Sequence, residues 1–169
     1  EEYLQHYVPL LPAAWLRGLA RSFSRRQCNA VDTVVVPSSA MADRLTRYGV
    51  ATPLALLPPG IPLARFARGN GAAFRASHGI PPERPLALFV GRVAHEKNIG
   101  FLLDAFARAH QRCPEALLLV TGEGPAMESL RQQATRLGLA DSVRFLGYLD
   151  RASALPDCYA AADLFVFAS

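Results

Sequence analysis

Two cations follow a short apolar run near the middle of the chain. Arg92 and Lys97 come after the segment LALFV (86–90), and Gly91 separates that segment from the first cation. A guanidinium offers a planar set of donors and an ammonium a compact charge, so the pair suits a diphosphate. Loop cations also serve solubility, and this pattern by itself leaves both interpretations open.

The segments on either side of these cations indicate where an anion would bind. The unbroken apolar run 86–90 is typical of a parallel strand buried on both faces. A helix over Ile99–Gln111, with Asn98 as its cap, is predicted by apolar residues that recur every three or four positions. A helix N-terminus favours an anion, and open α/β sheets bind ligands at the carboxyl ends of their strands. We therefore expect a phosphate between the strand and the helix.

A glycine-containing turn, TGEGP (121–125), follows the next predicted strand. Gly122 and Gly124 would allow backbone N–H groups to face a ligand, and Glu123 could accept a hydrogen bond from a hydroxyl. The same residues also fit a plain tight turn from strand to helix, and Met127 occupies a position where a dinucleotide fingerprint needs glycine. This motif alone leaves its role open.

A third segment, VRFLGY (143–148), lies at the following strand. Its backbone groups could read the edge of a nucleotide base, with Phe145 or Leu146 as apolar cover. Considered alone, Phe145 and Tyr148 fit core positions better than ligand contacts.

The order of predicted elements indicates an α/β fold. Strands at 86–90, 116–120, 142–146 and 164–167 alternate with helices, the last helix being capped by Asp150, which predicts a parallel, doubly wound sheet. Before them we predict a helix to about residue 30, a strand at 31–39, a helix at 41–48 and a strand at 53–60. Prolines and glycines from Pro58 to Gly71 interrupt regular structure, so the predicted domains are 1–60 and 61–169.

Composition and charge narrow the class of protein. The chain is 51% hydrophobic but has no apolar run near the roughly 20 residues that span a bilayer. The three distant cysteines, Cys28, Cys113 and Cys158, favour reduced thiols in the cytoplasm. No metal ion, cofactor or nucleic acid partner is expected.

Positive charge is concentrated in the first part of the chain, where residues 1–75 hold nine arginines against four acids. The first predicted helix carries Arg17, Arg21 and Arg25 opposite an apolar face of Leu16, Leu19, Ala20 and Phe23. Such a helix either lies on anionic lipid, with Trp15 at the interface, or packs on its own domain with the arginines in water.

Taken together, the motifs resemble a known family. FVGRxxxEKN, TGEGP, VRFLGY and YAAADLFVFAS, in this order, resemble the donor-binding domain of retaining glycosyltransferases of family 4, the group 1 glycosyltransferases. VDTVVVPSS and LPPGIPxxRF are similar to the passage between that family's two domains. The resemblance implies a GT-B fold with Rossmann-like domains, of which this fragment holds the end of the N-terminal acceptor-side domain and most of the C-terminal donor-binding domain.

The resemblance also implies roles for individual residues. Arg92 and Lys97 match the catalytic cations that hold the diphosphate of a nucleotide sugar, and Glu96 matches a structural acid. The donor-binding set is Gly91, Gly122, Glu123, Gly124, Arg144, Phe145 and Leu146. The family's Glu-x7-Glu pair would begin just past Ser169, and its acceptor-side loop would precede Glu1, so we expect a catalytic parent and a weakly nucleotide-binding fragment.

The activity implied is sugar transfer from a UDP-, GDP- or ADP-sugar to an acceptor hydroxyl with retention of configuration. EEYLQHYVP (1–9) looks like the acceptor-side segment of diacylglycerol glucosyltransferases, which implies a lipid acceptor at the inner face of the membrane. Two alternatives stay open, a nucleotide-sugar 2-epimerase of the same architecture and a non-catalytic nucleotide-binding module.

Overall fold

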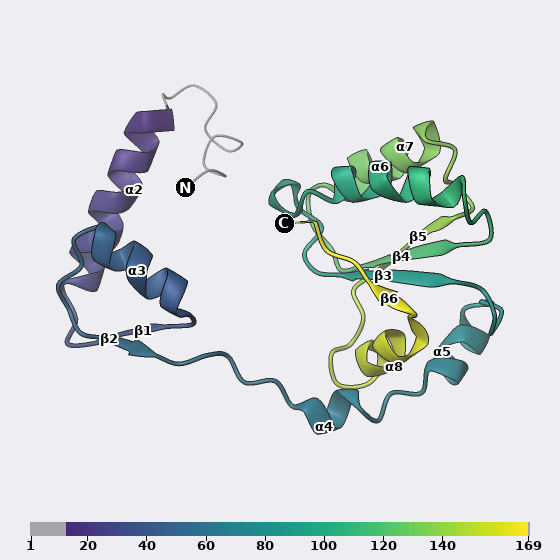
Figure 1. The fold of residues 1–169 in the computed structure, drawn as a ribbon, viewed down its shortest axis with the longest axis horizontal. Helices are drawn as coiled ribbons and strands as arrows, with labels where there is room; N and C mark the ends of the chain where they lie inside the picture. Colours follow the sequence, from purple (N-terminus) through teal and green to yellow (C-terminus); the bar gives the residue numbers. More distant parts are fainter. Residues whose placement is uncertain (1–12, 169) are drawn as a thin grey trace. The chain divides into compact units, whose positions relative to one another are not determined.

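The computed structural model describes residues 13–168 and divides the chain into two compact units, Glu1–Ile61 and Pro62–Ser169 (Figure 1). The division falls among the prolines and glycines at 58–62, where Pro58, Pro59 and Pro62 lack the backbone N–H that a helix or sheet would use. Each unit is described by itself below. The segment EEYLQHYVP (1–9) lies outside the described residues.

Over residues 13–61, unit 1 contains two helices and a pair of short parallel strands. Its elements are α2 (Ala13–Cys28), β1 (Val34–Val36), α3 (Ser39–Arg47) and β2 (Leu54–Leu56). The strands are shorter than predicted because they pair only over three residues each, and because Ser38 already caps α3, its hydroxyl accepting from the Met41 N–H at 3.3 Å.

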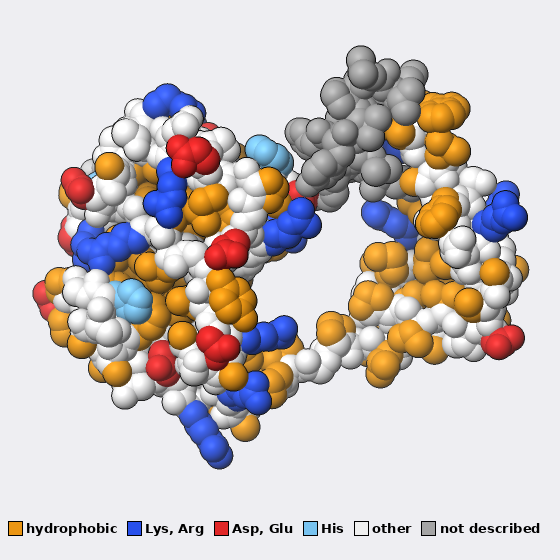
Figure 2. Space-filling model, turned by 180° about the vertical axis from the view of Figure 1, so that it is seen from behind, with side chains coloured by type: hydrophobic (Ala, Val, Ile, Leu, Met, Phe, Trp, Pro, Cys, Tyr) orange, Lys and Arg blue, Asp and Glu red, His pale blue; other side chains and the backbone are white. Residues whose placement is uncertain are grey.

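The apolar residues of α2 do not all face the interior. Leu16 is buried, but Leu19 and Phe23 are 49% and 67% exposed, and together with Trp15 they recur every four residues along one side of the helix. Leu16, Leu19 and Phe23 therefore lie on one side of the helix as predicted, but of these three only Leu16 is buried. Figure 2 shows hydrophobic side chains gathered on the visible face of this unit.

Unit 2 is built on a four-stranded parallel sheet, which confirms the predicted α/β fold. The strands are β3 (Leu86–Val90), β4 (Leu117–Thr121), β5 (Val143–Gly147) and β6 (Leu164–Phe165), in the order β5-β4-β3-β6. Helices α6 (Ile99–His110) and α7 (Met127–Arg136) cover one face, and α5 (Gly71–Ser77) and α8 (Ala154–Ala161) the other (Figure 1). All of β4 is buried, as expected of a central strand covered on both sides.

Successive residues of the central strands enter two separate cores. Leu86, Leu88, Leu117 and Leu119 pack with Phe74 of α5 and Cys158 of α8, whereas Phe89, Leu118 and Val120 pack with Leu103 and Phe106 of α6. This alternation follows from the period of two along a strand. Burial raises the pKa of the Cys158 thiol to about 12, so this cysteine stays protonated.

Two local predictions were wrong. A short helix, α4 (Leu63–Phe66), forms directly after Pro62, where we expected no regular element. Asn98 does not cap α6 through its side chain; it adopts a left-handed conformation, φ 50°, after the 3-10 turn η1 (His95–Lys97). Asparagine tolerates this conformation better than most residues, which accounts for its place between the two helices.

A buried arginine links several elements by hydrogen bonds at the amino end of the sheet. Arg75 is only 8% exposed; its guanidinium donates to the Ala161 carbonyl at 2.9 Å and to the Asp163 carboxylate at 3.0 Å. Its Nη1 also donates to the carbonyls of Pro81, Pro82 and Arg84. Asp163 in turn accepts from the Leu86 N–H at 2.8 Å, so a single network joins α5, α8 and the start of β3.

Within residues 13–168, no helix combines the length and the apolar character needed to cross a membrane.

Candidate functional site

The loops that follow β3 and β4 are joined through their backbones. The Gly91 N–H donates to the Thr121 carbonyl at 3.1 Å and the Val93 N–H to the Glu123 carbonyl at 2.9 Å. The Ala126 N–H returns a hydrogen bond to the Val93 carbonyl at 3.1 Å. The two loops that the sequence singled out therefore lie side by side at the carboxyl edge of the sheet.

The glycines of the second loop are needed for this close approach. A Cβ atom on Gly122 would overlap the carbonyl oxygen of Gly91, and one on Gly124 would overlap that of Val93. Gly122 also has φ +118°, a conformation that other residues rarely adopt. Its own N–H donates to the Gly147 carbonyl at 2.7 Å, so this glycine contributes to the packing of the loops.

The end of β5 joins the same edge. The Gly147 carbonyl also accepts from the Thr121 hydroxyl at 3.0 Å. Because Val120 pairs with Phe145 and Thr121 pairs with Gly147, Leu146 is an extra residue in the strand. The three loops after β3, β4 and β5 thus meet through Gly91, Gly122 and Gly147.

Arg92 lies on this edge with its guanidinium accessible. Its side chain is 60% exposed, and Nη1 lies 3.7 Å from Oε1 of Glu96, whose own side chain is only 18% exposed. Such a pair contributes little energy when one partner faces water. Glu96 therefore orients Arg92 but leaves much of the guanidinium surface open to solvent.

Lys97 is held in a different way. Its ammonium nitrogen lies 5.3 Å from the ring centroid of Phe167, just beyond β6. Between the two cations, Val93 and Ala94 are 0% and 1% exposed. These buried residues anchor the middle of the loop, so Arg92 and Lys97 extend from a fixed backbone.

The structure does not bring Arg144 to these cations. Arg144 is the second residue of β5, near the amino end, and its Nη1 donates to the His78 carbonyl at 2.7 Å. The Phe145 ring lies 5.0 Å from the guanidinium carbon of Arg131 and packs against the α6/α7 core, and Leu146 packs against the α5/α8 core. The side chains of these three residues serve the interior of the unit.

Two aromatic residues at the carboxyl edge were not among the predicted site residues. Tyr148 directly follows β5 and is 67% exposed, so its expected core position is wrong. Phe167 follows β6 and is 50% exposed. Their places just after two strand ends are the signal that would have found them, because ligands of parallel sheets bind at that edge.

Glu123 is exposed on the loop between the two glycines, and its carbonyl rather than its carboxylate makes the bond to Val93. Its side chain is therefore accessible to solvent. Together with Gly91, Gly122 and Gly124 it belongs to the joined pair of loops that carries Arg92.

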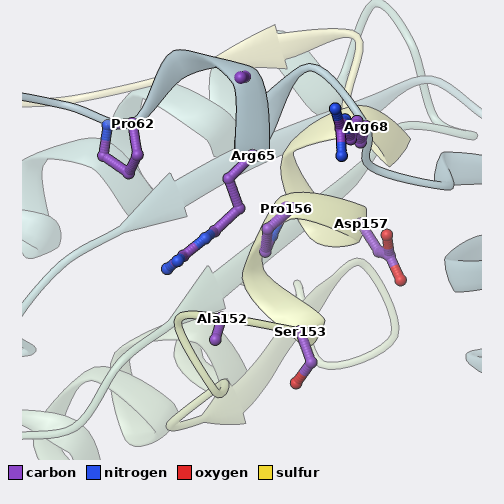
Figure 3. A pocket seen from close by; sticks show the side chains of 8 residues that line it. Pro62, Arg65, Arg68, Ala152, Ser153, Pro156 and Asp157 are labelled. Atoms are coloured by element: carbon purple, nitrogen blue, oxygen red, sulfur yellow. The ribbon is translucent and has the colours of Figure 1, made fainter.

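A separate hollow of about 470 Å³ lies between α4 and α8 (Figure 3). Arg65 and Arg68 line it together with Ser153 and Asp157, and Figure 3 shows Arg65 and Asp157 pointing in different directions. None of the sequence-predicted site residues lines this hollow.

The turn that precedes α8, beside this hollow, is closed by the carboxylate of Asp150. Asp150 accepts from the Ser153 hydroxyl at 2.6 Å and from the N–H groups of Ala152 and Ser153, and these bonds, the hydroxyl first, lower the pKa of Asp150. The predicted capping role of Asp150 is wrong, because α8 begins at Ala154 with Ser153 as its N-cap and no side-chain cap bond, and Asp150 instead closes the turn before the helix.

Two protein families match this chain. Residues 71–169 match the family described as "Glycosyl transferases group 1", and residues 3–65 match "Glycosyltransferase Family 4". The first match covers more than half of the chain.

Known proteins resemble the chain over most of its length. It is 34% identical to the alpha-monoglucosyldiacylglycerol synthase of Streptococcus pneumoniae, over 100% of this chain and 39% of that protein. It is 32% identical to a GDP-mannose-dependent alpha-(1-6)-phosphatidylinositol monomannoside mannosyltransferase of Mycolicibacterium smegmatis, over 87% of this chain and 39% of that protein. The chain thus spans about two fifths of these relatives.

Among solved structures, Anabaena HepE in complex with UDP and glucose superposes with a TM-score of 0.77 at 22% identity. The match covers 90% of this chain and 42% of HepE. At this identity the likeness concerns the fold.

Proposed function

The chain belongs to the group 1 glycosyltransferases, and on this premise we propose that the full-length protein transfers a sugar from a nucleoside diphosphate sugar to an acceptor hydroxyl, with retention of configuration. The observation that carries the proposal is the pair of hydrogen-bonded loops at the carboxyl edge, from which Arg92 and Lys97 extend. Family membership alone would leave open whether this chain has kept a usable donor site.

In this proposal the two cations stabilise the leaving group. Cleavage of the bond between the sugar and the diphosphate leaves negative charge on the nucleoside diphosphate, and fixed cations at that position lower the energy of the transition state. Arg92 supplies several donors and Lys97 a single charge, both on a loop anchored by buried Val93 and Ala94. The protein's own cations would perform this step without a metal ion.

The remaining contacts to the donor come mostly from the backbone. Gly91, Gly122 and Gly124 bring the two loops together, and exposed Glu123 would accept from a donor hydroxyl. We place the nucleotide base at the backbone of Phe145 and Leu146, near the carboxyl end of β5. Arg144 would contribute backbone atoms only, since its side chain is bound to the His78 carbonyl.

We also propose that residues 1–60 belong to the acceptor-side domain and residues 61–169 to the donor-binding domain. The separate family matches at 3–65 and 71–169 and the division between Ile61 and Pro62 support this assignment.

A lipid is the acceptor that we propose, reached by peripheral contact with the cytoplasmic face of the membrane. Both relatives described above are named for glycolipid substrates or products. On α2, Trp15 and Phe23 are 55% and 67% exposed, beside arginines that would meet anionic headgroups. Flotation of the full-length protein with vesicles should require anionic lipid, and flotation that is absent with both anionic and neutral vesicles would end this part of the proposal.

The epimerase alternative is not favoured, because the similar proteins are named as synthases and transferases that join a sugar to an acceptor. The two activities are distinguished by their products, because a transferase yields a glycosylated acceptor and an epimerase only inverts one carbon of the sugar.

The proposal is tested by incubating the full-length protein with UDP-, GDP- and ADP-sugars, first in a thermal-shift assay and then with diacylglycerol and its monoglucoside as acceptors. We expect one nucleotide to raise the melting temperature and the same donor to yield a glycolipid. If no nucleotide sugar shifts the melting temperature and no product forms, the proposed activity is wrong.

A further inference from the structure

Phe167 belongs to a stack of aromatic rings that reaches the candidate site. Its ring lies parallel to that of Phe89, with an interplanar angle of 6° and 5.8 Å between centroids. Phe89 is 0% exposed, whereas Phe167 is 50% exposed. The stack therefore begins in the core under β3 and ends at the surface.

Both rings of this stack are fixed in place. A Cβ atom on Gly91 would lie 3.3 Å from Cζ of Phe89, so the Phe89 ring tip lies close to Gly91 at the start of the cation loop. The chain leading to Phe167 is tied to β3 by the Val166 N–H, which donates to the Leu88 carbonyl at 2.9 Å. The backbone that carries Phe167 is thus held against β3, and its ring lies parallel to the buried ring of Phe89.

Lys97 lies over the ring of Phe167. The ammonium nitrogen lies 5.3 Å from the ring centroid, within the range of a cation–π contact. A lysine side chain has four rotatable bonds, and a fixed ring face restricts where its charge is found.

The two cations are therefore oriented by opposite kinds of partner. Glu96 holds Arg92 with a negative charge, which competes with any anion for the same guanidinium. A neutral ring attracts the ammonium through its quadrupole and leaves the full charge of Lys97 available to an incoming phosphate.

We propose that Phe167 is a positioning residue for Lys97, whose ammonium its ring face holds ready for the diphosphate of the donor. This inference rests on the proposed function, because it assigns a partner to one of the proposed phosphate-binding cations. It predicts that an aromatic ring at residue 167, rather than apolar volume alone, sets the affinity for phosphate.

The experiment measures the dissociation constants of UDP and of inorganic pyrophosphate for the full-length protein by calorimetry. Phe167→Leu should weaken both about fourfold, the effect of losing a partly exposed cation–π contact. Phe167→Tyr and Phe167→Trp should stay within about twofold of the wild type, since both keep a π face. In a Lys97→Met background, Phe167→Leu should cause no further loss, because the ammonium that it orients is already gone.

Phe165→Leu is the matched control. Phe165 is also 50% exposed and lies on β6, but its ring lies near Tyr159, with 5.9 Å between centroids. This control should leave both dissociation constants unchanged, and melting temperatures identify any variant that loses affinity through unfolding.

The outcomes separate the two proposals. If the wild type binds and Lys97→Met weakens binding, while Phe167→Leu binds as the wild type does, the positioning role is wrong and the proposed function stands. The positioning role would also be wrong if Phe167→Leu and Phe167→Tyr weakened the affinity for UDP and pyrophosphate equally. It would be wrong as well if Phe167→Leu weakened this affinity as much in the Lys97→Met variant as in the wild type. A wild type that binds neither UDP nor pyrophosphate would overturn both proposals.

Discussion

The two edges of the sheet in unit 2 use arginine for opposite purposes. At the amino edge, Arg75 is 8% exposed and donates to four backbone carbonyls and to Asp163. At the carboxyl edge, the Arg92 side chain is 60% exposed and has one ion pair, to Glu96. An arginine whose donors are taken up by the chain stabilises the fold, whereas an arginine left open on an anchored loop is available to a ligand.

The largest effect that this comparison predicts is on stability at the amino edge. Arg75→Met should lower the free energy of unfolding by about 4 kcal/mol, because it removes the donors to the buried Ala161 carbonyl and to three part-buried carbonyls, each bond contributing about 1 kcal/mol. Urea denaturation measures the loss. Arg84→Met, which removes the bond from Arg84 Nε to the Glu115 carbonyl, is the control at about 1 kcal/mol. Equal costs for the two variants would contradict the special role of Arg75.

At the carboxyl edge the expected effect is on rate. Arg92→Ala should lower kcat/KM of the full-length enzyme about a hundredfold, or about 3 kcal/mol of transition-state stabilisation. Its melting temperature should hardly change, since an exposed ion pair contributes little. Arg112→Ala, at an exposed position before β4, serves as the control for surface charge. Unchanged turnover in Arg92→Ala would show that Arg92 does not stabilise the leaving group.

The close backbone contact between the loops that follow β3 and β4 can be disrupted without changing either cation. Gly122→Ala should cost about 2 kcal/mol more than Gly79→Ala, because both glycines have positive φ but only the Gly122 Cβ would meet a carbonyl oxygen. Denaturation gives the stability difference, and UDP binding should weaken only in Gly122→Ala. Similar behaviour of the two variants would mean that the loops adjust without strain.

The side chain of Arg144 can be tested separately from its backbone. Arg144→Met should cost about 1 kcal/mol, the value of one hydrogen bond to the His78 carbonyl, and should leave the UDP dissociation constant unchanged. A weaker affinity for UDP in this variant would show that the side chain takes part in donor binding.

The smallest expected effect concerns Asp150, a carboxylate near the carboxyl edge that serves the fold. Hydrogen bonds from Ser153 and Ala152 hold the pKa of Asp150 below its ordinary value, so its stabilising contribution is present above about pH 4 and is lost as the pH falls through the lower native pKa. Asp150→Ala should therefore melt below the wild type at neutral pH, and the gap should close in acid. A gap that stays constant down to pH 2 would contradict this linkage.

Some parts of the site were predictable because they depend on local chemistry. The strand Leu86–Val90 has the predicted bounds, since an apolar run buried on both faces needs no particular partner to be recognised. Asp150 was recognisable as a hydrogen-bonding residue for the same reason, because its bonds reach only two and three residues along the chain, although they close the turn before α8 and do not cap the helix.

Other features of the structure could not be predicted, because distant residues decide them. Nothing within VRFLGY indicates that Arg144 turns to the His78 carbonyl, which is 66 positions away in sequence. Likewise, position 122 requires a glycine because the carbonyl of Gly91, which follows the neighbouring strand β3, leaves no room for a Cβ atom. Proximity across a sheet depends on strand order, which local patterns do not encode.

The sequence by itself determined the alternation of strands and helices, the position of the cation loop and the family to which these motifs point, because each is written in contiguous residues. Only the tertiary structure decided that Glu123 and Val93 share a hydrogen bond and that Lys97 lies over Phe167. Those contacts follow from the order β5-β4-β3-β6, which brings together loops that are 30 to 70 residues apart in sequence.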